Sequence, residues 1–181
     1  METSEFRSLF ASEVRSAINW DLLEARCGIS LEIITEHQEL GELQTVWHLG
    51  VDGVMSDWRD RTARRLTVAE AARLECVPSP AGAKFIRTVA SEYSKGLHPR
   101  VWGIPLYKTK SGSTIVLDGN HRATALLRSG APIRLLGAVA HGFDSAELLP
   151  DLLRDTVPQL TDSDWATRVS EIDDGLEMAR L

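Results

Sequence analysis

The chain has little cysteine and no long apolar run. Its 181 residues include two cysteines, Cys27 and Cys76, which lie far apart and form neither a CxxC pair nor part of a set of metal ligands. This usage argues against a zinc site and favours a reduced, cytoplasmic protein. No stretch approaches the roughly 20 apolar residues that span a bilayer, and the start of the chain lacks the features of a signal peptide. We therefore expect no transmembrane helix, no secretory leader and no membrane partner.

Positive charge is also in short supply, with 20 Lys and Arg against 26 Asp and Glu and a formal net charge of -6. Such a field repels nucleic acid, so any DNA contact must be local. The densest basic group follows Trp58 and comprises Arg59, Arg61, Arg64 and Arg65. This Arg59–Arg65 cluster could bind a nucleic-acid backbone while the indole stacks on a base. Alternatively it is a solvated helix face paired with neighbouring acids.

Hydrophobic residues make up 43% of the chain, which is enough for one ordinary globular core. Near the N-terminus apolar residues recur every four positions, at Phe6, Phe10, Val14, Ile18 and Leu22. This spacing predicts an amphipathic helix over residues 4–26. A similar stripe predicts a second helix over residues 30–50. We interpret residues 1–58 as a helical N-terminal region.

Residues 59–145 are expected to form the main domain. Its first segment, residues 66–75, has a pattern that fits a strand or a helix equally well. The elements predicted after it are a helix over 81–95, hairpin strands over 103–109 and 114–117, a helix over 120–129 and a buried strand over 133–140. Residues 146–181 are expected to add helices that pack on the same core.

Residues 115–122 read IVLDGNHR and carry the strongest chemical signal of the chain. A short apolar strand ends abruptly, Gly119 permits a tight turn, and Asn120 opens a helix. A helix N-terminus attracts phosphate through its unpaired N–H groups and partial positive charge. Arg122 adds a guanidinium suited to phosphate oxygens, and His121 adds a donor or proton carrier.

Asp118 could hold a magnesium ion or orient Arg122 in this site. The alternative interpretation is a plain turn and helix cap, in which Arg122 pairs with Asp118 at the surface. His141 directly follows the predicted strand over 133–140, and it could reach the same pocket as His121. The residue types alone leave these interpretations open.

The segment IVLDGNHRATALLRSG, residues 115–130, resembles the signature of the ParB/sulfiredoxin superfamily, in which a strand leads through a Gly-x-His-Arg turn into an Ala-rich helix that ends in Gly. The resemblance extends over residues 66–141. It implies an α/β fold of ParB/sulfiredoxin type, a small mixed sheet with flanking helices. It also implies a nucleotide site lined by Gly119, Asn120, His121 and Arg122.

The family's activities narrow the expected function. Asn120 stands where sulfiredoxins carry a cysteine, which argues against sulfinic-acid reduction, and the chain is too short and acidic for the added parts of a partition protein. The resemblance then favours an ATPase with magnesium at Asp118, a base at Glu75 or Glu70, and Arg122 to offset phosphoryl charge. Relatives of this kind include DNases and plasmid fertility-inhibition effectors of the Osa type, which block conjugation and act on the transfer or secretion apparatus.

Two other functions fit the same sequence. One is a small-molecule kinase that uses ATP or ADP to phosphorylate a free hydroxyl such as that of serine. The other is a non-catalytic module that binds a protein or DNA.

Overall fold

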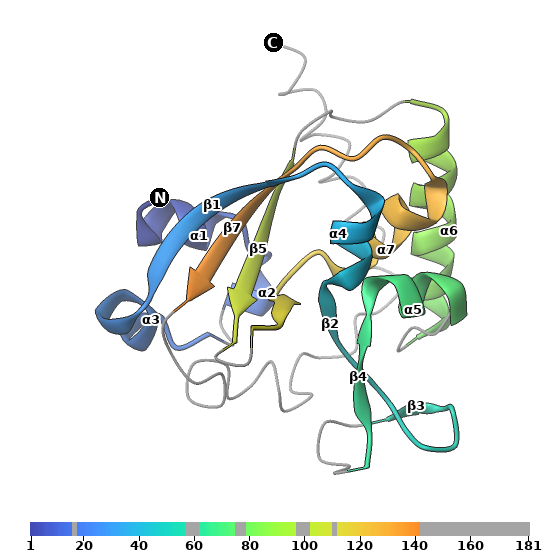
Figure 1. Cartoon of the computed structure of the whole chain (residues 1–181), viewed down its shortest axis with the longest axis horizontal. Coiled ribbons are helices and arrows are strands. Elements are labelled where there is room, and N and C mark those ends of the chain that lie inside the picture. Colours follow the sequence, from blue (N-terminus) through green and yellow to red (C-terminus); the bar gives the residue numbers. More distant parts are fainter. Residues whose placement is uncertain (16–17, 57–61, 75–78, 97–101, 110–111, 142–181) are drawn as a thin grey trace.

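The computed structural model describes residues 1–15, 18–56, 62–74, 79–96, 102–109 and 112–141, and these form a mixed α/β fold. Its described strands join into one seven-stranded sheet, with helices packed on both faces (Figure 1). The helices are α1 (Thr3–Ser8), α2 (Ser12–Arg15), α3 (Trp20–Arg26), α4 (His37–Glu42), α5 (Val68–Leu74), α6 (Pro80–Ser94) and α7 (Asn120–Ser129).

The sheet is built from β1 (Gly28–Ile34), β2 (Gln44–Leu49), β3 (Met55–Ser56), β4 (Arg64–Thr67), β5 (Trp102–Lys108), β6 (Thr114–Val116) and β7 (Leu135–His141). Its order is β1-β7-β5-β6-β2-β3, and β4 pairs with β2 beside this path. The pairs β5–β7 and β2–β6 are parallel, whereas β1–β7, β5–β6, β2–β3 and β2–β4 are antiparallel. The mixture arises because β6 returns along β5 as a hairpin and then lies parallel to β2.

Two hydrophobic cores lie on opposite faces of the sheet, because alternate residues of a strand point to opposite sides. On β5, Ile104 and Leu106 belong to the core that also contains the buried residues of α4–α7. Their neighbour Tyr107 belongs to the second core, which contains the buried residues of α1–α3. A strand buried on both faces is apolar along its length, as β5 and β7 are up to their exposed last residues, Lys108 and His141.

The predicted helix over residues 4–26 is broken into three short helices. The apolar stripe itself is confirmed, since Phe6, Phe10, Val14 and Ile18 are all buried in the second core. Spacing of four residues therefore identified the buried face. The same spacing could not show that the helix is interrupted between α1, α2 and α3.

The predicted helix over residues 30–50 is wrong. Residues 28–34 are strand β1, residues 37–42 are helix α4, and residues 44–49 are strand β2. Strand β1 pairs with β7 over seven consecutive residues, from Gly28 opposite His141 to Ile34 opposite Leu135. This long-range pairing outweighs a helical spacing. The interpretation of residues 1–58 as a helical region is corrected accordingly, because β1–β3 belong to the same sheet as the later strands.

The later predictions are more accurate. The predicted helices over 81–95 and 120–129 are α6 and α7, the predicted hairpin is β5 and β6, and the predicted strand over 133–140 is β7. The undecided segment is both strand and helix, β4 followed by α5. The helices predicted within residues 146–181 lie outside the described residues. Within the described part of the chain, no helix has the length and apolar character needed to cross a membrane.

The packing of α1–α3 on the sheet can be tested at Phe10. Its ring is 3% exposed and lies 5.1 Å from the ring of Phe6 and 5.4 Å from that of Trp20. We expect Phe10→Ala to lower the free energy of unfolding by about 3–5 kcal/mol in urea titration, because it leaves a cavity. Leu31→Ala on β1 is the control, since Leu31 is 50% exposed and should cost under about 1 kcal/mol. Equal effects of the two changes would contradict this packing.

Candidate functional site

The turn between β6 and α7 follows the carboxyl end of β6, which lies parallel to β2 at a single paired position, Ile115 opposite Gln44. Ligands of sheets with parallel strands often bind beyond the carboxyl ends of such strands. Gly119 is the N-cap of α7, with φ of 83°, and no side chain caps the helix. Because L-residues rarely adopt this conformation, a glycine is required here. The first-turn amides of α7 are therefore not covered by a cap side chain.

Asn120 ties this turn to both parallel strands. Its Oδ1 accepts a hydrogen bond from the Val46 amide of β2 at 3.2 Å, and its Nδ2 donates to the Val116 carbonyl of β6 at 3.2 Å. The side chain is buried, and it fills the place where β2 and β6 diverge after a single paired position. Asn120 was predicted to bind phosphate, but its side chain instead links β2 to β6. Its backbone N–H remains part of the helix start.

Asp118 is held by two backbone amides. Its Oδ2 accepts from Ala11 at 2.8 Å, and its Oδ1 accepts from Gly119 at 2.6 Å. The first bond fixes the junction of α1 and α2 to the turn. Among the described residues no ion pair joins Asp118 to Arg122, so the alternative interpretation of a surface pair does not hold. The described part of the chain also contains no group of three His, Cys, Asp or Glu residues arranged to hold a metal ion.

Arg122 lies against an aromatic side chain. Its guanidinium is 4.9 Å from the centre of the Trp102 ring, at the start of β5, and is partly exposed. A cation over an indole face is attracted by the ring, yet the N–H groups at the guanidinium edge keep their donor capacity. Burial raises the pKa of the Tyr93 phenol, and the positive charge of Arg122 opposes that rise. Trp102 therefore contacts Arg122 and Tyr93 lies within reach of its charge, and the sequence analysis assigned neither residue to the site.

His121 points to a different side of α7. Its ring packs edge-on against Trp47 at 4.8 Å and Phe85 at 6.1 Å. A Cβ added at Gly82, in the first turn of α6, would lie 2.6 Å from His121 Nε2. Only a glycine at that position allows α6 and α7 to approach this closely. His121 is thus a packing residue between two helix starts, which gives little support to its expected role as a proton carrier.

Glu70 is engaged in local structure. Its carboxylate accepts from Arg64 at 2.8 Å and from the Thr67 amide at 3.0 Å, and Thr67 Oγ1 donates to the Glu70 side chain and accepts from the Glu70 amide. The bond from Arg64 is the largest cause that holds the pKa of Glu70 below its usual range. A carboxylate with a lowered pKa is a weaker base. Glu75, the other candidate base, lies outside the described residues.

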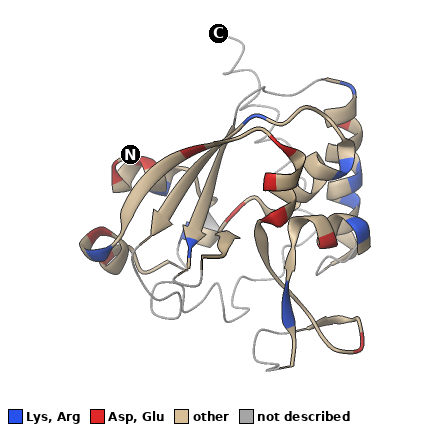
Figure 2. Cartoon of the chain, in the orientation of Figure 1, with Lys and Arg blue, Asp and Glu red and all other residues tan. Residues whose placement is uncertain are grey.

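The Arg59–Arg65 cluster is described only at Arg64 and Arg65, which occupy the blue segment of β4 in Figure 2. They differ sharply. Arg64 is exposed and paired with Glu70, whereas Arg65 is mostly buried, and burial lowers the pKa of its guanidinium. Neither residue resembles a simple exposed patch for nucleic acid.

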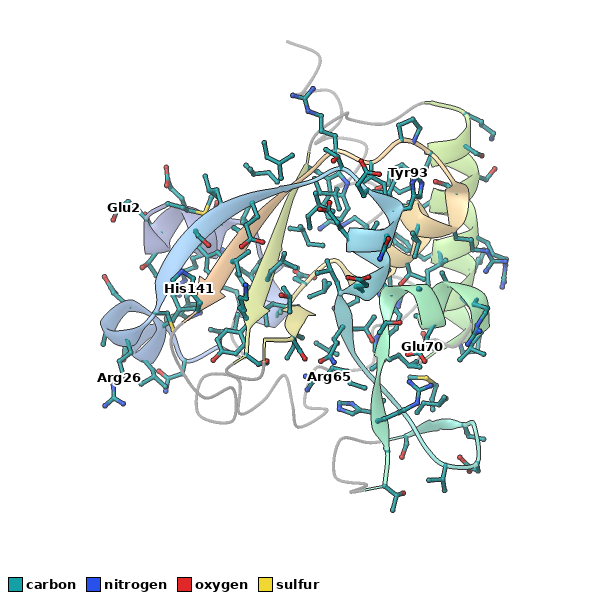
Figure 3. All side chains as sticks on the ribbon, in the orientation of Figure 1. Glu2, Arg26, Arg65, Glu70, Tyr93 and His141 are labelled. Atoms are coloured by element: carbon teal, nitrogen blue, oxygen red, sulfur yellow. The ribbon has the colours of Figure 1, made fainter. Side chains whose placement is uncertain are left out.

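His141 does not lie near His121. It pairs with Lys108 at one end of β5, whereas the turn at Gly119 contacts Trp102 at the other end. Six residues of strand separate these ends by about 20 Å. Figure 3 shows His141 on the side of the sheet away from the helices α4–α7. The expectation of a shared pocket is wrong.

No protein-family model, curated protein or solved structure matches this chain.

The bridging role of Asn120 predicts a large effect on stability. Asn120→Ala leaves the Val46 N–H and the Val116 carbonyl without their partners, and we expect it to cost about 2–4 kcal/mol of unfolding free energy. Hydrogen exchange at the Val46 amide should accelerate. Asn19→Ala is the control, because Asn19 Oδ1 caps the exposed start of α3 and its loss should cost about 1 kcal/mol. An unchanged Val46 exchange rate would contradict the bridge.

The Glu70 pair predicts a pH dependence. Because the folded pKa lies below the ordinary value of 4.5, the pair stabilises the protein above that pH and loses its effect as the pH falls through the folded pKa. We expect Glu70→Gln to cost about 1 kcal/mol at neutral pH, since both side chains are partly exposed. The difference from the parent should shrink as the pH falls below the ordinary value of 4.5 and through the lower folded pKa. The matched control is Glu24→Gln, an exposed acid of α3. A pH-independent difference for Glu70→Gln would rule out this account.

Proposed function

We propose that the chain binds the phosphate group of a nucleotide at the start of α7. The observation that carries this proposal is the pairing of an uncapped helix start with a guanidinium that no described acid neutralises. Arg122 lies in the first turn of α7 and curls back, so that a Cβ at Gly119 would lie 3.6 Å from its Nη2. The helix amides and the guanidinium can therefore reach one anion together.

The negative charge of Asp118 limits how an anion can bind. Its carboxylate already occupies the Gly119 amide, one step before the helix. A phosphate must therefore use the amides of residues 120–122, and it needs Arg122 to balance the charge of Asp118. Because Trp102 supports the guanidinium from one face, the stacking restricts its rotamers before a ligand arrives. This arrangement favours a phosphate over a weakly charged ligand.

The order of strand, glycine turn and helix also supports a ParB/sulfiredoxin-type fold as a proposal. Strand β6 leads through Gly119 into α7, and α7 ends at Gly130 with φ of 66°, as the resembling segment requires. On that resemblance the nucleotide is ATP with Mg²⁺, and its hydrolysis is the expected reaction. Glu75 is then the better candidate base, because Glu70 is bound by Arg64. DNase activity and inhibition of conjugation rest on the resemblance alone.

The test is calorimetry with ATP, ADP and CTP, with and without Mg²⁺, followed by analysis of released phosphate. We expect ATP binding by the parent protein and a loss of about 10–100-fold in affinity for Arg122→Ala, the range for a hydrogen-bonded ionic contact. Arg122→Lys should fall between them, because a lysine keeps the charge without the forked geometry.

Arg128→Ala is the matched control, because Arg128 lies in the last turn of the same helix. It should bind ATP like the parent. Thermal unfolding of each variant separates loss of the site from loss of the fold. ATP binding that is unchanged in Arg122→Ala, or absent from the parent, would refute the proposal.

A further inference from the structure

Arg65 is a mostly buried arginine that pairs with none of the acids in the described part of the chain. Its Nε is buried and has no hydrogen-bond partner among the residues that the structure describes. Its neighbour Arg64 is exposed and is paired with Glu70 at 2.7 Å. The side chain as a whole is partly exposed, so an anion from solvent can reach the guanidinium, and a mostly buried guanidinium is stabilised by such a partner.

The strand register places Arg65 on a definite face. It lies opposite His48 of β2, and paired residues project to the same side. Trp47 and Leu66, the neighbours of these two residues, belong to the core beneath α4–α7. Arg65 and His48 therefore share the opposite face of the β2–β4 ribbon. In Figure 3 Arg65 lies on the side of β4 that faces β6.

This face lies beside the middle of β2, which contacts the start of α7. The Val46 amide donates to Asn120, and His48 follows two residues later, a step of about 7 Å along the strand. Arg65 is therefore near the turn after β6 but belongs to a different element from Arg122.

We propose that Arg65 binds a phosphate oxyanion on this face of the β2–β4 ribbon. The forked guanidinium can donate two parallel hydrogen bonds to phosphate oxygens on the face that it shares with His48. The chain has 26 acidic residues, yet none of the described ones pairs with Arg65. An anion from outside the chain supplies the missing charge. This inference uses residues separate from the α7 site and stands without it.

The experiment uses the Arg122→Ala protein as parent, so that the α7 site cannot contribute. Thermal unfolding is measured in chloride and in pyrophosphate of equal ionic strength, for this parent and after adding Arg65→Met or Arg64→Met. Pyrophosphate should raise the Tm of the parent and of the Arg64→Met protein by about 5 °C at saturating concentration, and it should leave the Arg65→Met protein unchanged. In chloride alone, Arg65→Met should raise the Tm by about 2–8 °C, because it removes an unbalanced buried charge.

Arg65→Lys covers the case in which Arg65→Met does not fold, and it should reduce the pyrophosphate shift without abolishing it. A short single-stranded oligonucleotide is tested in parallel. If only the oligonucleotide raises the Tm, and the rise requires Arg65, the anion is a phosphodiester backbone. If pyrophosphate raises the Tm in the same way, the anion is a small phosphate ligand. A shift retained in Arg65→Met, or no shift with either probe in the parent, overturns the inference.

Discussion

The side-chain amide of Asn120 holds together the three elements that form the candidate site. It accepts from the Val46 amide and donates to the Val116 carbonyl, so it joins β2 to β6 where they diverge. Because it is also the first residue of α7, the same bonds fix where that helix begins. A buried amide with both polar groups satisfied specifies one geometry, since any shift would leave a backbone group without a partner. The positions of Gly119 and Arg122 follow from this bridge.

The sequence predicted best where the signals were local. A glycine with positive φ ends the turn at Gly119 and another closes α7 at Gly130, and both could be recognised from residue type and spacing. The helix α6 has a serine N-cap followed by proline, a strong local start signal. The stripe from Phe6 to Ile18 identified a buried face correctly. In each case a few neighbouring residues determine the structure.

The predictions that failed concern structure that is determined by contacts between residues far apart in the sequence. Strand β1 exists because Gly28–Ile34 pairs with β7, more than 100 residues later, and no local pattern contains that partner. The carboxylate of Asp118 is committed to the Ala11 amide, at a separation of 107 residues. Trp102 became a platform for Arg122 only because β6 returns along β5 and brings Gly119 beside it. Motif reading identified the residues of the turn but not what each side chain contacts.

Three arginines show why residue type alone could not assign roles. Arg64 binds Glu70 and stabilises the start of α5, so its charge is balanced within the protein. Arg122 rests on Trp102, and an indole attracts a cation without neutralising it. Arg65 is mostly buried, its Nε has no hydrogen-bond partner, and none of the described acids pairs with it, which makes its environment the least favourable of the three. Of these three arginines, only Arg64 is paired with a described acid, at the exposed start of α5. Arg122 lies on α7, which Asn120 ties to β2, and Arg65 lies on β4, which pairs with the same strand. The shared strand β2 therefore connects the two guanidiniums that no described acid neutralises.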